Sequence, residues 1–383
     1  MKFYSLNKTP LANRVFSGVK YDEGSFKSIM SKILKTFGYK APSEIFTEDD
    51  KNLTIDVFAD GEICPIFRKR VRDEHVFIMA DGHKSDEILK LLLTVDAAKR
   101  AGAKKITVIY PYSPYSRQDK NDHVRSSIGA KLLADMLQVA GVTRIITIEL
   151  HSPAIQGFYN IPVIHLNGNI IFNDYVKEMK FQDVTICSPD HGAIKRNSDF
   201  AKYFPDALNA VIDKKRKKPN EVASMEITGV ENVIGRNVIC VDDMGDTLGT
   251  LAKASALVMS KGALSFRAFL THPVLSGEAL KTLFSSTITE LIVSDTIPSV
   301  YEKQMCYETM LFKEAESAVQ AENGCEICYV DEDCGKSAIE EMLIKVRANH
   351  PKFTIVSCDK LLIDCINRVV NKKSVNELNI NVA

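Results

Sequence analysis

The residues best suited to chemistry in this sequence lie in one segment, 237–250. There an apolar run, Val238–Val241, ends in two adjacent carboxylates, Asp242 and Asp243, and then in a small, hydroxyl-rich turn. The run is short and rich in β-branched residues, which predicts a buried strand, and the helix formers of Leu251–Lys261 predict a helix after the turn. Two carboxylates at the end of a strand can accept hydrogen bonds from a cis-diol, and the turn can hold a phosphate at the helix N-terminus. A pentose phosphate would satisfy both halves of the segment.

Further polar side chains follow other strand-like runs of the chain, and these are Arg117, Gln118, His151 and Asp190. Because the carboxyl ends of parallel strands meet at one edge of a sheet, together they could hold a magnesium–nucleotide there. Taken singly, each is more often a surface or structural residue. Imidazole is also a poorer ligand for magnesium than oxygen, so His151 could instead contact a phosphate oxygen.

A dense run of cations, 214–218, follows Asp213 and the strand-like run Ala207–Ile212. A block of like charge is usually a solvated tail or a nucleic-acid patch. Beside an acidic pair and a phosphate turn, a more specific interpretation is a clamp over transferring phosphates, where cations and magnesium offset developing negative charge. We expect this segment to lie beyond the strand and to be mobile before ligand binds.

The composition is that of a globular protein large enough for two cores. The chain has 383 residues, 45% hydrophobic and 26% charged, and Lys+Arg and Asp+Glu both number 49. A net charge of zero gives no whole-molecule attraction to nucleic acid or membranes, so we expect neither as a partner. The absence of a spanning stretch and of a secretory signal predicts a cytoplasmic protein. Nine cysteines, with Cys187 and Cys240 inside apolar runs, fit reduced thiols better than disulfides.

Strand-like runs alternate with helical stretches, which is the α/β pattern of parallel sheets. These runs are Val76–Ala80, Ile106–Tyr110, Ile145–Ile148, Val184–Cys187, Val238–Val241, Ser265–Leu270 and Leu291–Val293. A gapless comparison pairs 101–103 with 261–263, which indicates an internal duplication of one strand–helix–strand unit; the alternative is chance likeness between two such units. We predict an N-terminal domain, 1–165, and a C-terminal domain, 166–383.

The alternation fails at about 301–350, which predicts an insertion containing a helix over Ser337–Ala348. A strand over 351–356 and a helix over Lys360–Val370 then resume the fold. Four residues could form a zinc site near the insertion: Cys325, Cys328, Cys334 and His350. A second Cys-x-x-Cys pair is missing, so we expect no zinc there.

Several separated motifs, in this order, resemble those of the ribose-phosphate diphosphokinases, also called phosphoribosyl pyrophosphate synthetases. The motifs are Phe58–Glu62, Tyr115–Asp119, Leu150-His151, Ile155–Phe158, Ser188–Asp190, Asp213–Arg216, Asp242–Thr250 and Thr271–Gly277. The resemblance covers most of 57–298 and resumes from Phe353. It implies two type I phosphoribosyltransferase-like domains and a magnesium-dependent reaction of ATP with ribose 5-phosphate. It also implies a homo-oligomer, built from dimers and up to a hexamer, in which a neighbouring subunit completes the adenine site.

The resemblance further implies a role for each matching residue. Those that would contact ATP are Phe58, Asp60 and Glu62, from across a subunit interface, and Arg117, Gln118 and Asp119. Those that would hold ribose 5-phosphate are Asp242, Asp243, Asp246, Thr247, Gly249 and Thr250. His151 and Asp190 would organise magnesium, and the catalytic residues would be Lys214, Arg216 and His151.

Some positions depart from the family pattern. Leu248 stands where a small residue is usual, Glu149 where aspartate is usual, and Gly129 where a hydroxyl is usual. These changes touch the surroundings of the phosphates and leave two alternatives open. The acceptor could be a larger ribosyl compound such as ADP-ribose, or the chain could be a non-catalytic regulatory homologue.

Overall fold

The chain divides into two compact units. The computed structural model describes residues 2–5, 11, 15, 52–80, 82–218, 221–323 and 332–379. The first unit comprises 1–171, 296–298 and 357–381, and the second comprises 172–295, 299–356 and 382–383. The division at residue 171 is close to the expected one at 165. The segment 357–381 differs from expectation, because it belongs to the first unit and not to the second.

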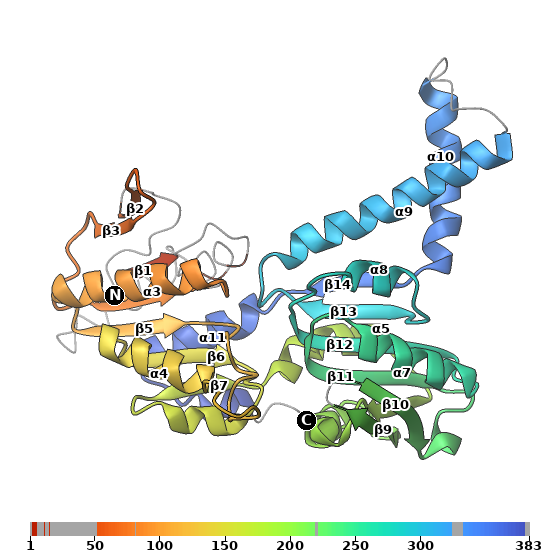
Figure 1. Cartoon of the computed structure of the whole chain (residues 1–383), viewed down its shortest axis with the longest axis horizontal. Coiled ribbons are helices and arrows are strands. Elements are labelled where there is room, and N and C mark those ends of the chain that lie inside the picture. The colour runs from red at the N-terminus through yellow and green to blue at the C-terminus, as the bar shows by residue number, and fades with distance from the viewer. Residues whose placement is uncertain are drawn as a thin grey trace, which may run out of the picture. The chain divides into compact units, whose positions relative to one another are not determined.

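The first unit is built on a five-stranded, fully parallel sheet with the order β1-β4-β5-β6-β7. Its strands are β1 (Lys2–Ser5), β4 (His75–Met79), β5 (Lys105–Ile109), β6 (Arg144–Ile148) and β7 (Val163–Leu166). Helices α3 (Ser85–Arg100) and α4 (Gly129–Ala140) cover one face and share a hydrophobic core with it. Helix α11 (Asp359–Val370) lies over the other face (Figure 1), which explains why the C-terminal segment belongs to this unit.

An antiparallel hairpin, β2 (Leu53–Val57) and β3 (Ile63–Phe67), precedes β4 in the chain. Its turn is closed by hydrogen bonds from Phe58 N to the Glu62 carbonyl (2.8 Å) and from Gly61 N to the Phe58 carbonyl (2.9 Å). Gly61 has a φ of 91°, which glycine adopts without steric cost. The hairpin therefore presents a tight and exposed turn.

The second unit contains a seven-stranded sheet with the order β10-β9-β8-β11-β12-β13-β14, in which only β10 runs antiparallel to its neighbour. The strands are β8 (Val184–Ser188), β9 (Leu208–Lys218), β10 (Glu221–Thr228), β11 (Asn237–Gly245), β12 (Ser265–Pro273), β13 (Glu290–Ser294) and β14 (Lys352–Val356). The shorter helices are α5 (Asn173–Met179), α6 (Ile194–Ala201), α7 (Gly249–Ser260) and α8 (Ala279–Phe284). Alternate residues of the central strands, Val238, Cys240, Phe266 and Ala268, form the core of this unit.

The predicted insertion forms two long helices, α9 (Val300–Asn323) and α10 (Glu332–Asn349). They pack against each other and extend away from the sheet of their unit (Figure 1). Arg347 pairs with Glu308 across them at 2.9 Å. The helix expected over Ser337–Ala348 lies inside α10, and β14 resumes the sheet after it.

The α/β fold with parallel sheets is confirmed, and each of the seven strand-like runs lies within or overlaps a strand. The two strand–helix–strand units also agree in position: Gly102 and Gly262 both have positive φ, and β5 and β12 both begin three residues later. Among the described residues, no helix combines the length and apolar character that crossing a bilayer requires.

The expectation that the cations 214–218 lie beyond a strand is wrong. They form the second half of β9, which continues from its buried residues Ala210 and Ile212 and pairs with β10. The backbone pairing with β10 provides hydrogen bonds that a solvated loop would take from water, so strand structure persists despite the charge.

Candidate active site

Two carboxylates stand at the carboxyl end of the central strand β11. Asp243 is buried, with 5% of its surface exposed, and Asp242 is half-buried. Arg196 of α6 pairs with both, at 3.1 Å to Asp242 Oδ1 and 3.5 Å to Asp243 Oδ1. The guanidinium thus bridges the acid pair that the sequence predicts to bind a diol.

The position of Arg196 is fixed by its neighbour on α6. The Asn197 side chain donates to the Val241 carbonyl (2.8 Å) and accepts from the Val241 amide (3.0 Å). This reciprocal pair holds α6 against β11 just before the acid pair. Sequence reasoning missed Arg196, because only the fold brings α6 beside the end of β11.

Burial raises the pKa of Asp242 to about 7, and the negative charges of Asp243 and Asp190 add to this rise, while Arg196 opposes it. The dependence on Asp190 shows that all three carboxylates belong to one electrostatic site. Their excess negative charge over a single arginine, and their oxygen donors, fit a hard divalent cation such as magnesium. The described residues contain no ready-made cluster of three ligands, and magnesium bound with a nucleotide needs only one or two carboxylates from the protein.

The turn expected to bind phosphate, residues 246–250, follows the acid pair directly in the chain and is called the phosphate turn below. Asp246 accepts a hydrogen bond from the Ser276 hydroxyl, and Leu275 N donates to the Gly245 carbonyl at 3.0 Å, so the loop after β12 fixes the turn. Thr247 and Thr250 are exposed, and α7 begins between them at Gly249. Helix N-terminal amides and exposed hydroxyls are the groups that bind a phosphate. The turn therefore has the donors that the sequence predicts.

Leu248 departs from the family pattern, and the structure shows how the turn accommodates it. Its φ is 60°, a left-handed conformation that costs a leucine about 1 kcal/mol. Its side chain is only 3% exposed and lies in the core of the second unit. Burial of a leucine contributes about 2 kcal/mol, which exceeds the backbone cost. The Leu248 side chain therefore fixes the turn to the core of the second unit, while Thr247 and Thr250 remain exposed and can face a ligand.

Asp190 and the start of the cationic run lie at neighbouring strands of the same sheet. Asp190 Oδ1 accepts from Ala193 N (3.1 Å) and so caps the turn after β8. Asp213 receives hydrogen bonds from Thr228 Oγ1 (2.7 Å) and from the His191 ring, which hold β9 in place where the cations begin. The side chains of Lys214 and Arg216 lie outside the described part of the structure, and their backbones pair with β10.

The remaining candidates belong to the first unit. His151 is exposed just beyond β6, where Leu150 N donates to His165 Nε2 (2.9 Å). Glu149, which stands where the family usually has aspartate, accepts a hydrogen bond from Gly168 N at 2.9 Å and so holds the loop after β7 in place. A β-carbon on Gly129 would lie 2.7 Å from Gln118 Oε1, so glycine makes room for the predicted nucleotide contact.

Arg117 and Gln118 are exposed beyond β5, and Asp119 beside them is half-buried. Phe58 of the hairpin turn is 54% exposed, and Asp60 and Glu62 are exposed with it. The structure thus brings together the acid pair, Asp190 and the phosphate turn in the second unit. It places the predicted ATP contacts and His151 in the first.

His350, one of the four zinc ligands considered from the sequence, already has a partner for each ring nitrogen. Its Nδ1 contacts the Phe284 carbonyl (2.9 Å) and its Nε2 contacts Glu314 (3.1 Å), so both ring nitrogens are engaged. Cys325 and Cys328 lie outside the described residues, as does the side chain of Cys334.

Both units of the chain are similar to known proteins. Residues 43–141 match the family model for the N-terminal domain of ribose phosphate pyrophosphokinase, and residues 182–314 match that for the phosphoribosyl synthetase-associated domain. A ribose-phosphate pyrophosphokinase of Helicobacter hepaticus is 35% identical over 330 residues, which cover 85% of this chain and 90% of the relative. One of Wolinella succinogenes is 44% identical over 250 residues, which cover 64% and 79%.

A solved structure agrees with these sequence relatives. The crystal structure of phosphoribosylpyrophosphate synthetase from Mycobacterium smegmatis superposes with a TM-score of 0.68 at 27% identity, covering 97% of this chain and 99% of that one. Matches to both domains, and relatives that align over most of their length, leave one assignment. The chain belongs to the ribose-phosphate pyrophosphokinase family, an enzyme family of phosphoribosyltransferase-like fold.

Proposed function

We propose that this chain transfers pyrophosphate from ATP to the anomeric hydroxyl of ribose 5-phosphate, giving phosphoribosyl pyrophosphate and AMP. The observation that carries the proposal is the acid pair Asp242–Asp243 placed directly before the phosphate turn 246–250 on one strand–helix junction. Two carboxylates suit the 2- and 3-hydroxyls of ribose, and the turn suits its 5-phosphate. The relatives carry the name of this activity.

The chemistry is an in-line displacement at the β-phosphorus of ATP. The anomeric oxygen forms a bond to the β-phosphorus as the bond from that phosphorus to the α,β-bridging oxygen breaks. The bridging oxygen leaves with AMP, and the anomeric hydroxyl loses its proton. Most of the rate enhancement comes from positioning and charge neutralisation, because phosphoryl transfer of this kind needs little covalent participation by protein.

The chain's own residues divide these tasks. Asp242 and Asp243 orient the sugar so that its anomeric hydroxyl faces the nucleotide. Lys214, Arg216 and His151 offset negative charge on the transferring phosphates. Asp190 and His151 would hold magnesium, which supplies positive charge at the phosphate oxygens when bound.

The acceptor is tested by supplying ribose 5-phosphate and ADP-ribose separately with magnesium-ATP and measuring AMP release. We expect AMP with ribose 5-phosphate alone, because the exposed threonines at the start of α7 suit a terminal phosphate. If AMP were released with ADP-ribose and not with ribose 5-phosphate, the acceptor would be ADP-ribose and the proposed type of reaction would stand. Release with neither would overturn the proposed activity.

A non-catalytic regulatory homologue is distinguished by Lys214→Ala. If Lys214 neutralises the transferring phosphates, the variant should lose turnover by about two orders of magnitude or more, the usual effect of removing one such group, and still bind ATP. Steady-state kinetics and equilibrium ATP binding measure the two effects. Lys215→Ala removes the same charge one residue away and should keep most of the activity. Equal turnover in all three proteins would remove Lys214 from the mechanism.

The assembly and compartment complete the proposal. A homo-oligomer is expected because the predicted adenine contacts of the hairpin turn, Phe58, Asp60 and Glu62, are exposed and point to use by another copy of the chain. Buried free thiols at Cys187 and Cys365 fit the reducing environment of the cytoplasm.

A further inference from the structure

Three large apolar side chains are exposed on the inserted helices α9 and α10. Met305 and Phe312 of α9 are 72% and 44% exposed, and Ile344 of α10 is 69% exposed. The residues that these helices bury in the core of the second unit are different ones, namely Tyr307, Leu311, Ala315, Val319, Met342 and Val346. Single exposed apolar side chains are common on protein surfaces, so the significance of these three depends on whether they lie together.

Helical spacing and one ion pair place the three side chains on the same side of the helical pair. Met305, Glu308 and Phe312 follow one another at intervals of three and four residues, so they form one stripe along α9. Ile344 and Arg347, three residues apart, lie on one side of α10 for the same reason. The ion pair between Glu308 and Arg347, at 2.9 Å, joins the two stripes. These five residues therefore form one surface, called the α9–α10 face below.

The α9–α10 face has the composition of a surface that binds another protein. Exposed apolar side chains that are grouped and accompanied by polar ones mark interaction sites. Phenylalanine, methionine and arginine, three of the residue types of this face, are enriched in protein–protein interfaces. The two helices extend away from the sheet of their unit (Figure 1), so a large partner can approach them.

The charge of the face indicates which partner it fits. One carboxylate and one guanidinium leave it neutral, so nucleic acid or an anionic membrane would gain no net attraction from it. The side chains of Glu308 and Arg347 are still 43% and 55% exposed, so each can also contact a group on a partner. Across a two-fold axis, a residue that contacts another is matched by the reverse contact. Glu308 of each copy can then meet Arg347 of the other, and the face is charge-complementary to itself.

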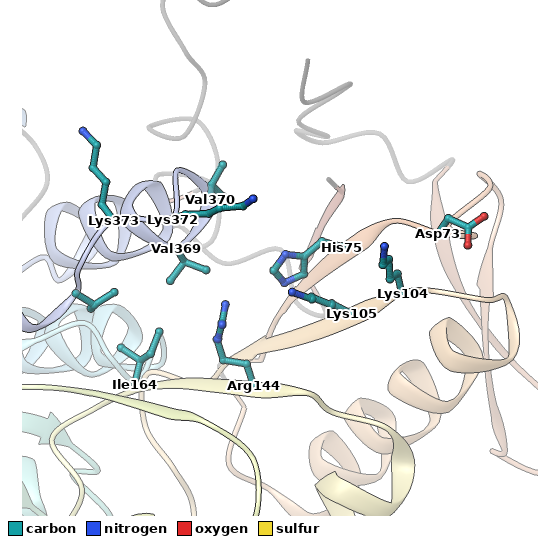
Figure 2. A pocket seen from close by; sticks show the side chains of 11 residues that line it. Asp73, His75, Lys104, Lys105, Arg144, Ile164, Val369, Val370, Lys372 and Lys373 are labelled. Atoms are coloured by element: carbon teal, nitrogen blue, oxygen red, sulfur yellow. The ribbon is translucent and has the colours of Figure 1, made fainter. Parts of the chain in front are cut away.

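Other surfaces of a second copy fit the α9–α10 face less well. In the first unit, for example, Lys105, Arg144 and Lys372 line a cationic cavity (Figure 2). A neutral face gains no net attraction from such a surface, and its own guanidinium would be repelled. Contact between two unlike surfaces also leaves one of each unpaired unless the copies close into a ring.

We propose that the α9–α10 face binds the same face of a second copy of this chain. Burial of the apolar side chains from both copies supplies the attraction, and the two charges set the orientation. The contact requires neither ATP nor ribose 5-phosphate, so it does not depend on the proposed reaction. It also differs from the contact expected of the hairpin turn 58–62, and two distinct interfaces can join more than two copies into a closed assembly.

The two charges provide a test that is specific to self-association. Glu308→Lys makes the face doubly positive and Arg347→Glu makes it doubly negative, so neither variant should bind itself. Sedimentation velocity of the full chain should show a smaller assembly for each variant than for the parent at the same concentration. An equimolar mixture of the two variants should regain the assembly of the parent, because their faces attract each other. Glu308→Lys/Arg347→Glu, which exchanges the charges, should keep that assembly without a second protein.

Met305→Glu/Ile344→Glu tests the apolar part of the face and leaves the ion pair in place. Both side chains are largely exposed, so the variant should fold normally and keep the circular dichroism spectrum of the parent. Its dissociation constant for the contact should rise about tenfold or more, as is usual when central side chains of an interface are removed. The matched control is Lys345→Glu, which reverses an exposed charge on another side of α10, two residues from Arg347, and should assemble like the parent.

Three results would overturn the proposal. The first is a parent protein that sediments as a monomer. The second is an assembly in Glu308→Lys, Arg347→Glu and Met305→Glu/Ile344→Glu that equals that of the parent. The third is a mixture of the two single charge variants that assembles no further than each variant does separately, because the face would then not be binding a copy of itself.

Discussion

At the scale of single residues, Arg196 has the largest consequence for the proposed reaction. The two carboxylates that it bridges are adjacent and largely buried, so their mutual repulsion would otherwise favour a protonated pair. A protonated carboxyl accepts hydrogen bonds from a diol less well than a carboxylate does. If Asp242 and Asp243 bind ribose as proposed, Arg196 acts through them and holds them in position for the sugar.

Replacing Arg196 should weaken ribose binding and change its pH dependence. In the parent, kcat/KM for ribose 5-phosphate should fall as the pH drops through the Asp242 pKa of about 7. Arg196→Gln removes a charge that lowers this pKa, so the fall should begin at higher pH, and KM should rise about tenfold or more. Steady-state kinetics across pH measure both effects. Lys195→Gln, at an exposed neighbouring position, should leave the pH dependence of kcat/KM unchanged. If kcat/KM of Arg196→Gln fell at the same pH as that of the parent, Arg196 would not be lowering the pKa of Asp242.

At the scale of elements, Glu290 links β13 to β14, the two strands between which helices α9 and α10 are inserted in the chain. Its carboxylate on β13 accepts from Tyr175 of α5 (2.6 Å) and from Thr354 of β14 (2.6 Å), and it pairs with Lys352 at 3.0 Å. Burial acts to raise its pKa, but these hydrogen bonds and the lysine outweigh burial and lower it. The ionised carboxylate thus docks β14 when the chain returns to the sheet.

Glu290→Gln should destabilise the second unit by about 1–3 kcal/mol, because a charged hydrogen-bond acceptor in a buried network is lost. A lowered folded-state pKa means that this stabilisation is present above the ordinary glutamate pKa and is lost as pH falls through the folded value. The difference between parent and variant in urea unfolding should therefore shrink in acid. Glu278→Gln, whose side chain is 71% exposed, should unfold like the parent. A pH-independent difference would mean that ionisation is not what stabilises β14.

Elements whose patterns are local were predictable, and elements that depend on distant partners were not. The junction from β11 to α7 follows from an apolar run, an acid pair and helix formers that are contiguous in sequence. The extension of β9 through its cations depends on β10, and the placement of α11 depends on the sheet of the first unit. Arg196 was missed for the same reason, since only the fold brings α6 to the end of β11.

At the scale of the whole molecule, the candidate residues are distributed over two units and over an exposed hairpin. Val57 and Phe58 are 66% and 54% exposed, which is unusual for large apolar side chains at a tight turn. The hairpin turn also carries Asp60 and Glu62. An aromatic ring beside carboxylates can stack on adenine and accept from its amino group, so the turn suits an adenine that another subunit presents.

Sharing of the adenine site between subunits has a consequence that mixing experiments can measure. Phe58→Ala should raise KM for ATP about tenfold, and Lys214→Ala should lose turnover. When the two variants are mixed and reassembled, about a quarter of the sites should combine an intact Phe58 from one subunit with an intact Lys214 from the other, if assembly is random. Activity at low ATP should then exceed the mean of the two separate variants. A mixture of Val57→Ala and Lys214→Ala should show an activity equal to the mean of those two variants measured separately, because neither protein lacks Phe58. A Phe58→Ala and Lys214→Ala mixture that also gave only the mean would show that each subunit binds adenine with its own hairpin.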